Sequence, residues 1–199
     1  MSAANIQAIV VGGSAGAIEA LASILPALPA DFPIPVAIAL HVHPSKPSHL
    51  AQVLGMRCAL PVKEAEDKEP LAPCTVYVAP PNYHLLLEKQ GYFSLSVDDP
   101  VLFSRPAIDV LFESAADAFG QALVGLLLTG ASEDGARGLA RIQKAGGLAL
   151  VQAPSTAAVR IMPEAALRLS APDHVLPLNE IGPFLARLDR RALPKREQG

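Results

Sequence analysis

Residues 8–16, with the sequence AIVVGGSAG, give the clearest indication of the fold class. It opens as a short apolar run rich in β-branched residues, which predicts a buried strand, and it closes with glycines on both sides of Ser14. Apolar residues then recur at helical spacing, at Ile18, Leu21 and Ile24, until Pro26 stops the pattern. A strand that passes almost directly into a helix predicts the first half of a βαβ unit.

The same alternation returns along the chain. Further strands are predicted by the apolar runs at 36–40, 123–128 and 148–151, and helices by the segments 48–54 and 135–144. Residues 62–97 differ, because a strand at 75–78 is followed by a predicted hairpin in which 85–87 and 92–97 flank the turn Lys89-Gln90-Gly91. We therefore predict an α/β fold: a doubly wound, mostly parallel sheet with helices on both faces and an antiparallel hairpin excursion.

Composition excludes several classes of protein. The 199 residues are 51% hydrophobic and 18% charged, which is typical of a folded chain with one core, so residues 1–190 are predicted to form one domain and 191–199 a polar tail. A net charge of −3 argues against binding to nucleic acid. No apolar run approaches the roughly 18 residues of a membrane span, and no signal peptide is visible, so we expect a cytoplasmic protein without membrane insertion. Cys58 and Cys74 are expected to be free thiols.

Polar side chains follow three of the predicted strands, and the carboxyl ends of parallel strands meet at one edge of a sheet. Ser14 stands in the first turn, in a G-x-S-x-G sequence between strand and helix that is typical of a nucleophile elbow. The same turn is also compatible with anion binding, or with close packing of helix and strand. The spacing of its glycines excludes the dinucleotide-binding and P-loop motifs.

Two histidines follow the second strand. His41 comes directly after it and is the candidate general base, because a serine hydroxyl needs a neighbouring imidazole to remove its proton. His41 and His43 could instead form a metal pair, but no compact carboxylate pattern accompanies them, and we expect neither a metal nor a cofactor. His84 lies in a proline-rich turn and could border the site.

Asp134 precedes the helix predicted at 135–144, together with Ser132 and Glu133. Taken alone, it is best interpreted as the N-cap of that helix. Combined with Ser14 and His41, it becomes the third member of a catalytic triad, which would orient the imidazole. The order Ser, His, Asp along the chain differs from that of the α/β-hydrolases, so the elbow does not place the chain in that family.

The chain resembles the catalytic domain of the chemotaxis protein-glutamate methylesterases, the CheB type, from Ile9 to about Leu188. The shared motifs, in chain order, are VVGGSAG at 10–16, HVHP at 41–44, VKEAED at 62–67, VYVAP at 76–80 with His84, RPAIDVLF at 105–112, LTGASEDG at 128–135 and MPE at 162–164. The resemblance implies a serine hydrolase that removes methyl groups from methylated glutamates of chemoreceptors, releases methanol, and often deamidates glutamine as well.

By position, the resemblance assigns Ser14, His41 and Asp134 to the triad, with His41 rather than His43 as the base. It places the backbone oxyanion donors near Ala15 and Ala131. His84 and Arg105 are the candidates for the border of the substrate cleft.

The chain departs from the family pattern at Ala15, Ala17 and Ala131, but backbone donors survive a change of side chain. The family's usual N-terminal receiver domain is absent from this sequence, so activity without phosphorylation is expected. The implied partners are methylated chemoreceptor helices and a separate receiver or methyltransferase component.

Two other functions stay open at this point. A non-catalytic scaffold of the same fold would bind receptor helices or a partner enzyme, and it predicts a broken triad or a blocked elbow. A small-molecule esterase would share the triad but not the substrate.

Overall fold

The protein is described by a computed structural model that covers residues 5–41 and 49–188. Its main sheet has the strand order β3-β4-β2-β1-β7-β8-β9, and every pairing in it is parallel. The strands are β1 (Ala8–Gly13), β2 (Val36–Leu40), β3 (Val62–Glu64), β4 (Val76–Val78), β7 (Leu123–Leu127), β8 (Leu148–Gln152) and β9 (His174–Leu176). β1, β2, β7 and β8 are buried along their whole length, which explains why they are continuously apolar in sequence.

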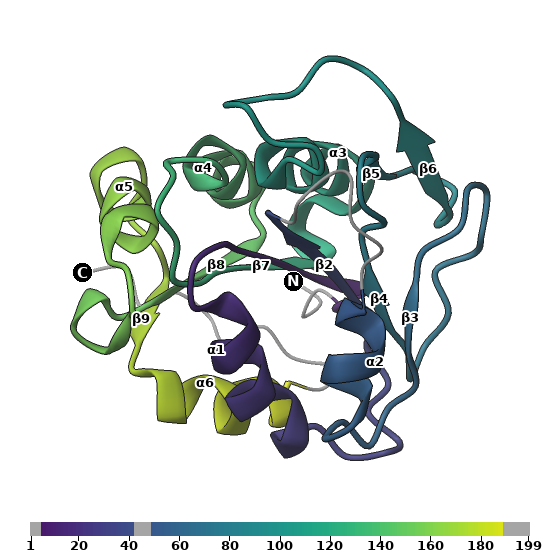
Figure 1. Ribbon diagram of the computed structural model, residues 1–199, viewed down its shortest axis with the longest axis horizontal. Coiled ribbons are helices and arrows are strands. Elements are labelled where there is room, and N and C mark those ends of the chain that lie inside the picture. The colour runs from purple at the N-terminus through teal and green to yellow at the C-terminus, as the bar shows by residue number, and fades with distance from the viewer. Residues whose placement is uncertain (1–4, 42–48, 189–199) are drawn as a thin grey trace.

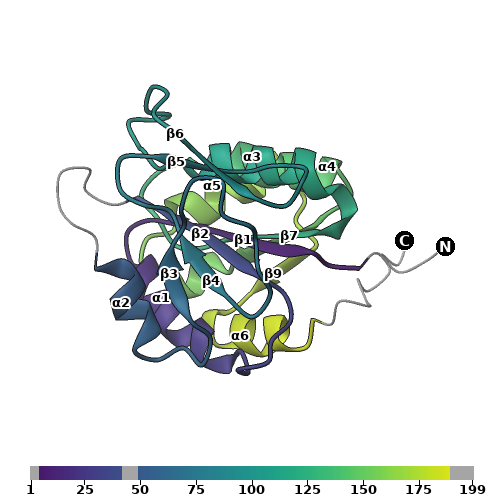
Figure 2. The ribbon, with the colours of Figure 1, turned by 90° about the vertical axis from the view of Figure 1, so that its right-hand side faces the viewer.

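Helices cover both faces of this sheet (Figure 1). One face carries α3 (Ile108–Phe119), α4 (Ala136–Lys144) and α5 (Ile161–Leu169), and the other carries α1 (Ala17–Ile24), α2 (Leu50–Gly55) and α6 (Leu178–Ala186). Short 3₁₀ segments lie at Leu25–Ala27, Gly120–Ala122 and Pro154–Thr156. Figure 2 shows the same two helical layers from the side, with the sheet between them. The predicted doubly wound architecture is confirmed.

The two faces of the sheet differ in the size of their side chains. Toward α1 and α6 the strands present large apolar residues such as Ile9, Ile38 and Leu126. Toward α3 and α4 many of the strand residues are small, among them Ala37 and Ala39. Small side chains let a helix approach a sheet closely, so α3 and α4 can reach the strand ends that carry the candidate site.

The predicted hairpin is also confirmed. β5 (His84–Leu87) pairs antiparallel with β6 (Phe93–Ser96) as a separate two-stranded sheet. Phe93 is fully buried, and its ring lies 4.7 Å from that of Tyr77 in β4, so the hairpin packs onto the main domain.

The sequence patterns placed the long strands within two residues of their observed ends, and β2 at its observed ends. β3 and β9 were not predicted; each has three residues and is only partly buried, so neither carries a clear apolar pattern. Cys58 and Cys74 are free thiols, as expected. The predicted tail at 191–199 lies outside the described residues.

Candidate active site

Ser14 stands directly after β1, in the turn that leads into α1. Its N–H donates to the carbonyl oxygen of Thr129 at 2.9 Å, and its own carbonyl oxygen accepts the N–H of Ala17 at 2.9 Å. Gly16 has φ of 81°, in the left-handed region that favours glycine, and a Cβ there would lie 2.7 Å from that of Ala158. The sharp elbow predicted around Ser14 therefore depends on this glycine.

The turn lies where the winding of the sheet reverses. After β1 the chain forms β2, β3 and β4 on one side of β1, and it then returns to form β7 on the other side. Ser14 follows β1, and Thr129 follows β7 by two residues. This crevice at the carboxyl ends of the strands is where doubly wound folds bind their ligands.

His41 is the neighbour of Ser14 across the sheet. Gly13 pairs with Leu40 in the parallel register of β1 and β2, so the next residues on the two strands are Ser14 and His41. The N–H of His41 donates to the carbonyl oxygen of Gly13 at 3.3 Å, which carries the pairing past the end of β2. Adjacent strands are about 4.8 Å apart, so the serine and the histidine stand side by side.

The ring of His41 is bonded to Asp134. Its Nε2 lies 2.8 Å from Oδ2 of Asp134, and the carboxylate is completely buried. Because a carboxylate only accepts hydrogen bonds, Nε2 carries the hydrogen, and in the neutral ring Nδ1 keeps the free lone pair. Among the described residues, no hydrogen bond joins His41 to the Oγ of Ser14. Catalytic hydrogen bonds are often long in the free enzyme and tighten when substrate binds.

Asp134 does not cap its own helix, so the interpretation of this residue as a simple N-cap is wrong. α4 begins at Ala136, and Gly135 is its N-cap without any side-chain bond. The Asp134 carboxylate instead accepts two N–H groups from the first turn of α3: Ile108 at 2.6 Å and Asp109 at 2.9 Å. The first N–H groups of a helix have no acceptor within the helix, so these two are free to bond to the carboxylate. They hold it in place with its Oδ2 facing the imidazole.

Thr129, which follows β7, is hydrogen-bonded to the turn that contains Ser14. Its buried hydroxyl lies 2.9 Å from the carbonyl oxygen of Ala15 and accepts the N–H of Val159 at 2.9 Å. The next residue, Gly130, lies against the nucleophile, because a Cβ on it would be 3.0 Å from that of Ser14. The elbow is thus tied to the loop that follows β7.

The proposed oxyanion donors lie in these same two turns. Ala15 and Ala131 are exposed, and in the described part of the chain their N–H groups donate to no acceptor. Ala15 precedes the N-cap of α1, where the positive end of the helix favours a developing anion.

His84 and Arg105 hold backbone rather than present free groups. His84 is buried; its Nδ1 accepts the N–H of Ala107, the N-cap of α3, at 3.2 Å, and its Nε2 donates to the carbonyl oxygen of Asp99 at 3.1 Å. Arg105 donates to two carbonyl oxygens of the loop after β6 and to Oδ1 of Asn82. In this structure both residues fix the segment that leads into α3.

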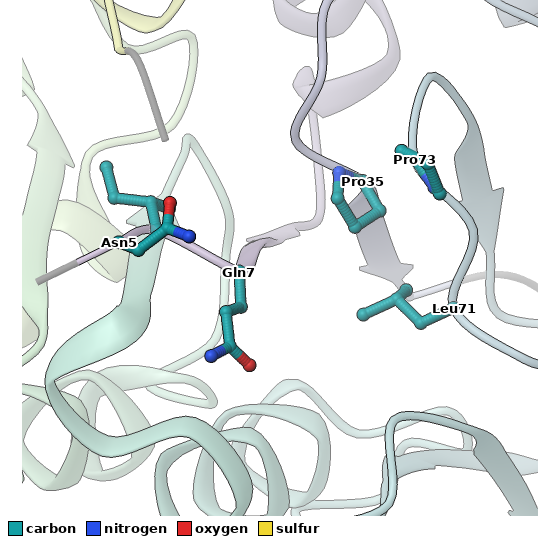
Figure 3. A pocket seen from close by; sticks show the side chains of 6 residues that line it. Asn5, Gln7, Pro35, Leu71 and Pro73 are labelled. Atoms are coloured by element: carbon teal, nitrogen blue, oxygen red, sulfur yellow. The ribbon is translucent and has the colours of Figure 1, made fainter. Parts of the chain in front are cut away.

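The described residues contain no group of three or more His, Cys, Asp or Glu side chains placed to hold a metal ion. His43 lies outside the described residues. A shallow pocket of about 220 Å³ opens near Gln7, Pro35 and Leu71, at the amino ends of β1 and β2 and therefore at the opposite edge of the sheet (Figure 3). None of its lining residues is ionisable, so this pocket offers no acid or base.

The sequence reasoning missed two residues that shape the site. Asp109 lies in the shared motif at 105–112 and Thr129 in the one at 128–135, and neither was assigned a role. Asp109 could be noticed only as an acidic residue in the first turn of a helix, a position that acidic residues often occupy.

None of the helices in the described part is long and apolar enough to cross a membrane.

Comparison with known proteins identifies the family of the chain. The family model for CheB methylesterase matches residues 9–185. A putative protein-glutamate methylesterase/protein-glutamine glutaminase of Leptospira interrogans is 47% identical over 192 residues, which cover 96% of this chain and all of that protein. The protein-glutamate methylesterase FrzG of Myxococcus xanthus is 37% identical over 177 residues, or 89% of this chain and 53% of FrzG.

A solved structure shares the fold. The crystal structure of the CheB methylesterase catalytic domain of Thermotoga maritima superposes with a TM-score of 0.87 at 33% identity, and the match covers 91% of this chain and 97% of that one. Fold and site define a hydrolase of the methylesterase class. The chain belongs to the CheB methylesterase family.

Proposed function

We propose that this chain hydrolyses the methyl esters of glutamate side chains on chemoreceptors, with Ser14 as nucleophile, His41 as general base and Asp134 as the residue that orients the histidine. One observation carries the proposal. Asp134, held by the N-terminus of α3, is bonded to the imidazole whose backbone neighbours the elbow serine. That arrangement provides a nucleophile, a base and an orienting group at one sheet edge.

The reaction proceeds in two halves. In the first, Nδ1 of His41 takes the proton of Ser14 as Oγ attacks the ester carbonyl. The N–H groups of Ala15 and Ala131 donate hydrogen bonds to the negatively charged oxygen of the tetrahedral intermediate. The imidazolium then gives its proton to the departing methoxide, so methanol leaves and a glutamyl ester of Ser14 remains. In the second half, water attacks that ester with His41 again as base, which frees the glutamate and restores the serine.

The same machinery would act on a glutamine side chain, with ammonia as the leaving group. The proposed partners are therefore receptor helices that carry glutamyl methyl esters or glutamine. A receiver or methyltransferase component on another chain is a further proposed partner.

The experiment that tests this function compares two substrates. Receptor membranes that carry isotopically labelled methyl groups, and a soluble methyl ester of a short glutamate peptide, are each incubated with the protein, and released methanol is measured. We expect methanol to be released from the receptor membranes, with a higher kcat/KM than from the soluble ester. Rapid turnover of the soluble ester alone would identify a small-molecule esterase, and no release from either substrate would favour a non-catalytic scaffold.

A further inference from the structure

A second buried carboxylate stands beside Asp134 and has no part in the reaction described above. Asp109, in the first turn of α3, is 1% exposed. Its Oδ1 accepts the N–H groups of Gly135 at 2.9 Å and Gly138 at 2.7 Å, and its Oδ2 accepts from Nε of Arg137 at 3.1 Å. All three donors belong to the start of α4.

Asp109 and Asp134 hold each other's helices. Asp134 precedes α4 and receives the N–H groups at the start of α3, while Asp109 lies in α3 and receives those at the start of α4. Neither helix has a side-chain cap from its own N-cap residue. The two aspartates therefore replace the local caps with a reciprocal pair between elements.

The two helices also lie too close for one to move freely over the other. A Cβ on Gly138 would lie 2.5 Å from that of Phe112 and 3.2 Å from Oδ1 of Asp109. Only glycine permits this contact, which brings the Gly138 N–H onto the carboxylate. A shift of the Asp109 carboxylate would therefore displace the backbone that immediately follows Asp134.

A carboxylate at this position is costly in itself. Burial raises the pKa of Asp109, and the neighbouring charge of Asp134 raises it further, while the N–H of Gly138 and the guanidinium of Arg137 act in the opposite direction. An ordinary N-cap needs only one acceptor, and an exposed serine or threonine supplies it without this penalty. The buried charge therefore points to a requirement for tight geometry at Asp134.

We infer that Asp109 is a positioning residue for the hydrolysis: its carboxylate fixes the start of α4, and its N–H fixes Oδ1 of Asp134, so that Oδ2 stays aimed at His41. The inference rests on the proposed triad and deepens it. Without the Asp109 carboxylate, the backbone after Asp134 would lose two of its bonds to α3. Displacements of about 1 Å in such a support cost on the order of a hundredfold in rate.

The test compares substitutions at two aspartates of α3. Asp109→Ala should lower kcat for labelled receptor membranes by about tenfold to a hundredfold and leave KM unchanged, because orientation of the imidazole matters in the transition state. Asp109→Asn keeps an oxygen for Gly135 and Gly138, so it should recover most of that loss. Asp117→Ala is the matched control: it removes an exposed partner of Arg141 two turns further along the helix, and it should leave kcat unchanged.

Two readouts separate positioning from general damage. Titration of Ser14 with a serine-directed phosphonate corrects each kcat for the fraction of folded enzyme. In an Asp134→Ala background, Asp109→Ala should add no further loss, since it acts through Asp134. If Asp109→Ala does not fold, Asp109→Ser, whose shorter side chain cannot reach both N–H groups, should show the same loss in kcat.

The possible failures are distinguishable. A wild-type protein that releases no methanol would overturn the proposed function and this inference with it. If the wild type is active, two results would overturn the inference about Asp109 but not the proposed function. The first is a kcat of Asp109→Ala, per titrated site, equal to that of Asp117→Ala. The second is a double variant of Asp109 and Asp134 in which the two losses in kcat multiply.

Discussion

Gly12 and Ile108 are in direct contact where α3 meets β1: a Cβ on Gly12 would lie 2.2 Å from Cγ2 of Ile108. Ile108 is completely buried and is the first residue of α3, whose N–H reaches Asp134 at 2.6 Å. The glycine before the elbow therefore does more than permit a turn. It lets the helix that holds Asp134, the proposed orienting residue, lie directly on the strand that precedes Ser14.

Gly12→Ala should accordingly damage both stability and catalysis. Overpacking against Ile108 is expected to cost about 1–3 kcal/mol, and displacement of α3 from Asp134 should lower kcat by roughly tenfold or more. Urea denaturation and methanol release measure the two effects. Gly55→Ala is the control, because its new Cβ would meet only Val62 at 3.7 Å. A Gly12→Ala variant as stable and active as the control would show that the contact is unimportant.

Asp134→Asn should abolish most turnover. The carboxylate accepts from His41 and from two N–H groups of α3, and an amide presents a donor where one of these acceptors stood. Loss of an orienting aspartate costs on the order of 10⁴-fold in kcat, whereas loss of a cap alone costs about 1 kcal/mol of stability. Steady-state kinetics and thermal unfolding of the same preparation separate the two. A destabilised variant with normal specific activity would assign Asp134 to capping only.

The stability of the protein should depend on pH through Asp109. Burial raises its pKa in the folded state above the ordinary value of 3.8, so its contribution to stability is fully present below the unfolded pKa and is lost as pH rises through the folded pKa. Asp109→Asn has no such titration. The free energy of unfolding of the wild type minus that of the variant should therefore fall as pH rises from acid to neutral. Denaturation at a series of pH values tests this, and a difference that is constant or that rises with pH would contradict it.

The turn at Leu102 and Phe103 is a candidate for stabilisation. Both residues have positive φ, 47° and 65°, and Val101 and Ser104 on either side exchange two backbone hydrogen bonds. This is the geometry of a tight hairpin turn that favours Asn-Gly, and a left-handed backbone costs bulky residues roughly 1–2 kcal/mol each. Leu102→Asn with Phe103→Gly should raise the free energy of unfolding by about 1–2 kcal/mol, measured in urea.

Phe103→Ala separates the backbone from the exposed ring in that experiment. Alanine is as strained as phenylalanine in this conformation, so the single variant should gain little. An equal gain from Phe103→Ala would mean that the fully exposed ring, and not the backbone, is the source of the effect.

Most of the fold, and the place of Ser14 and His41 at one edge of the sheet, could be predicted because their signals are local. β1, β2, β7 and β8 are buried on both faces, so each is a continuous apolar run. Ser14 and His41 each follow such a run directly, and parallel strands must bring the following turns to one edge. The sequence alone therefore predicts that Ser14 and His41 lie together at the edge formed by the carboxyl ends of the strands.

The support around the triad could not be predicted in the same way. Asp109 and Asp134 are 25 residues apart, and each holds the other's helix only after α3 and α4 have packed. The contacts of His84 show the same limit: its ring is buried and accepts the N–H of Ala107, which its place in a proline-rich turn does not reveal. Such contacts depend on tertiary packing, which no spacing in the sequence encodes.

If Ser14 is the nucleophile that removes methyl groups from receptor glutamates, methanol release must depend on its hydroxyl group, and the variant Ser14→Ala measures that dependence. Wild type and variant, both shown to be folded, are incubated with receptor membranes that carry labelled methyl esters. We expect steady release of methanol by the wild type and essentially none by the variant, and a serine-directed phosphonate should label only the wild type, at Ser14. Release by Ser14→Ala at the wild-type rate, or labelling at another serine, would contradict it.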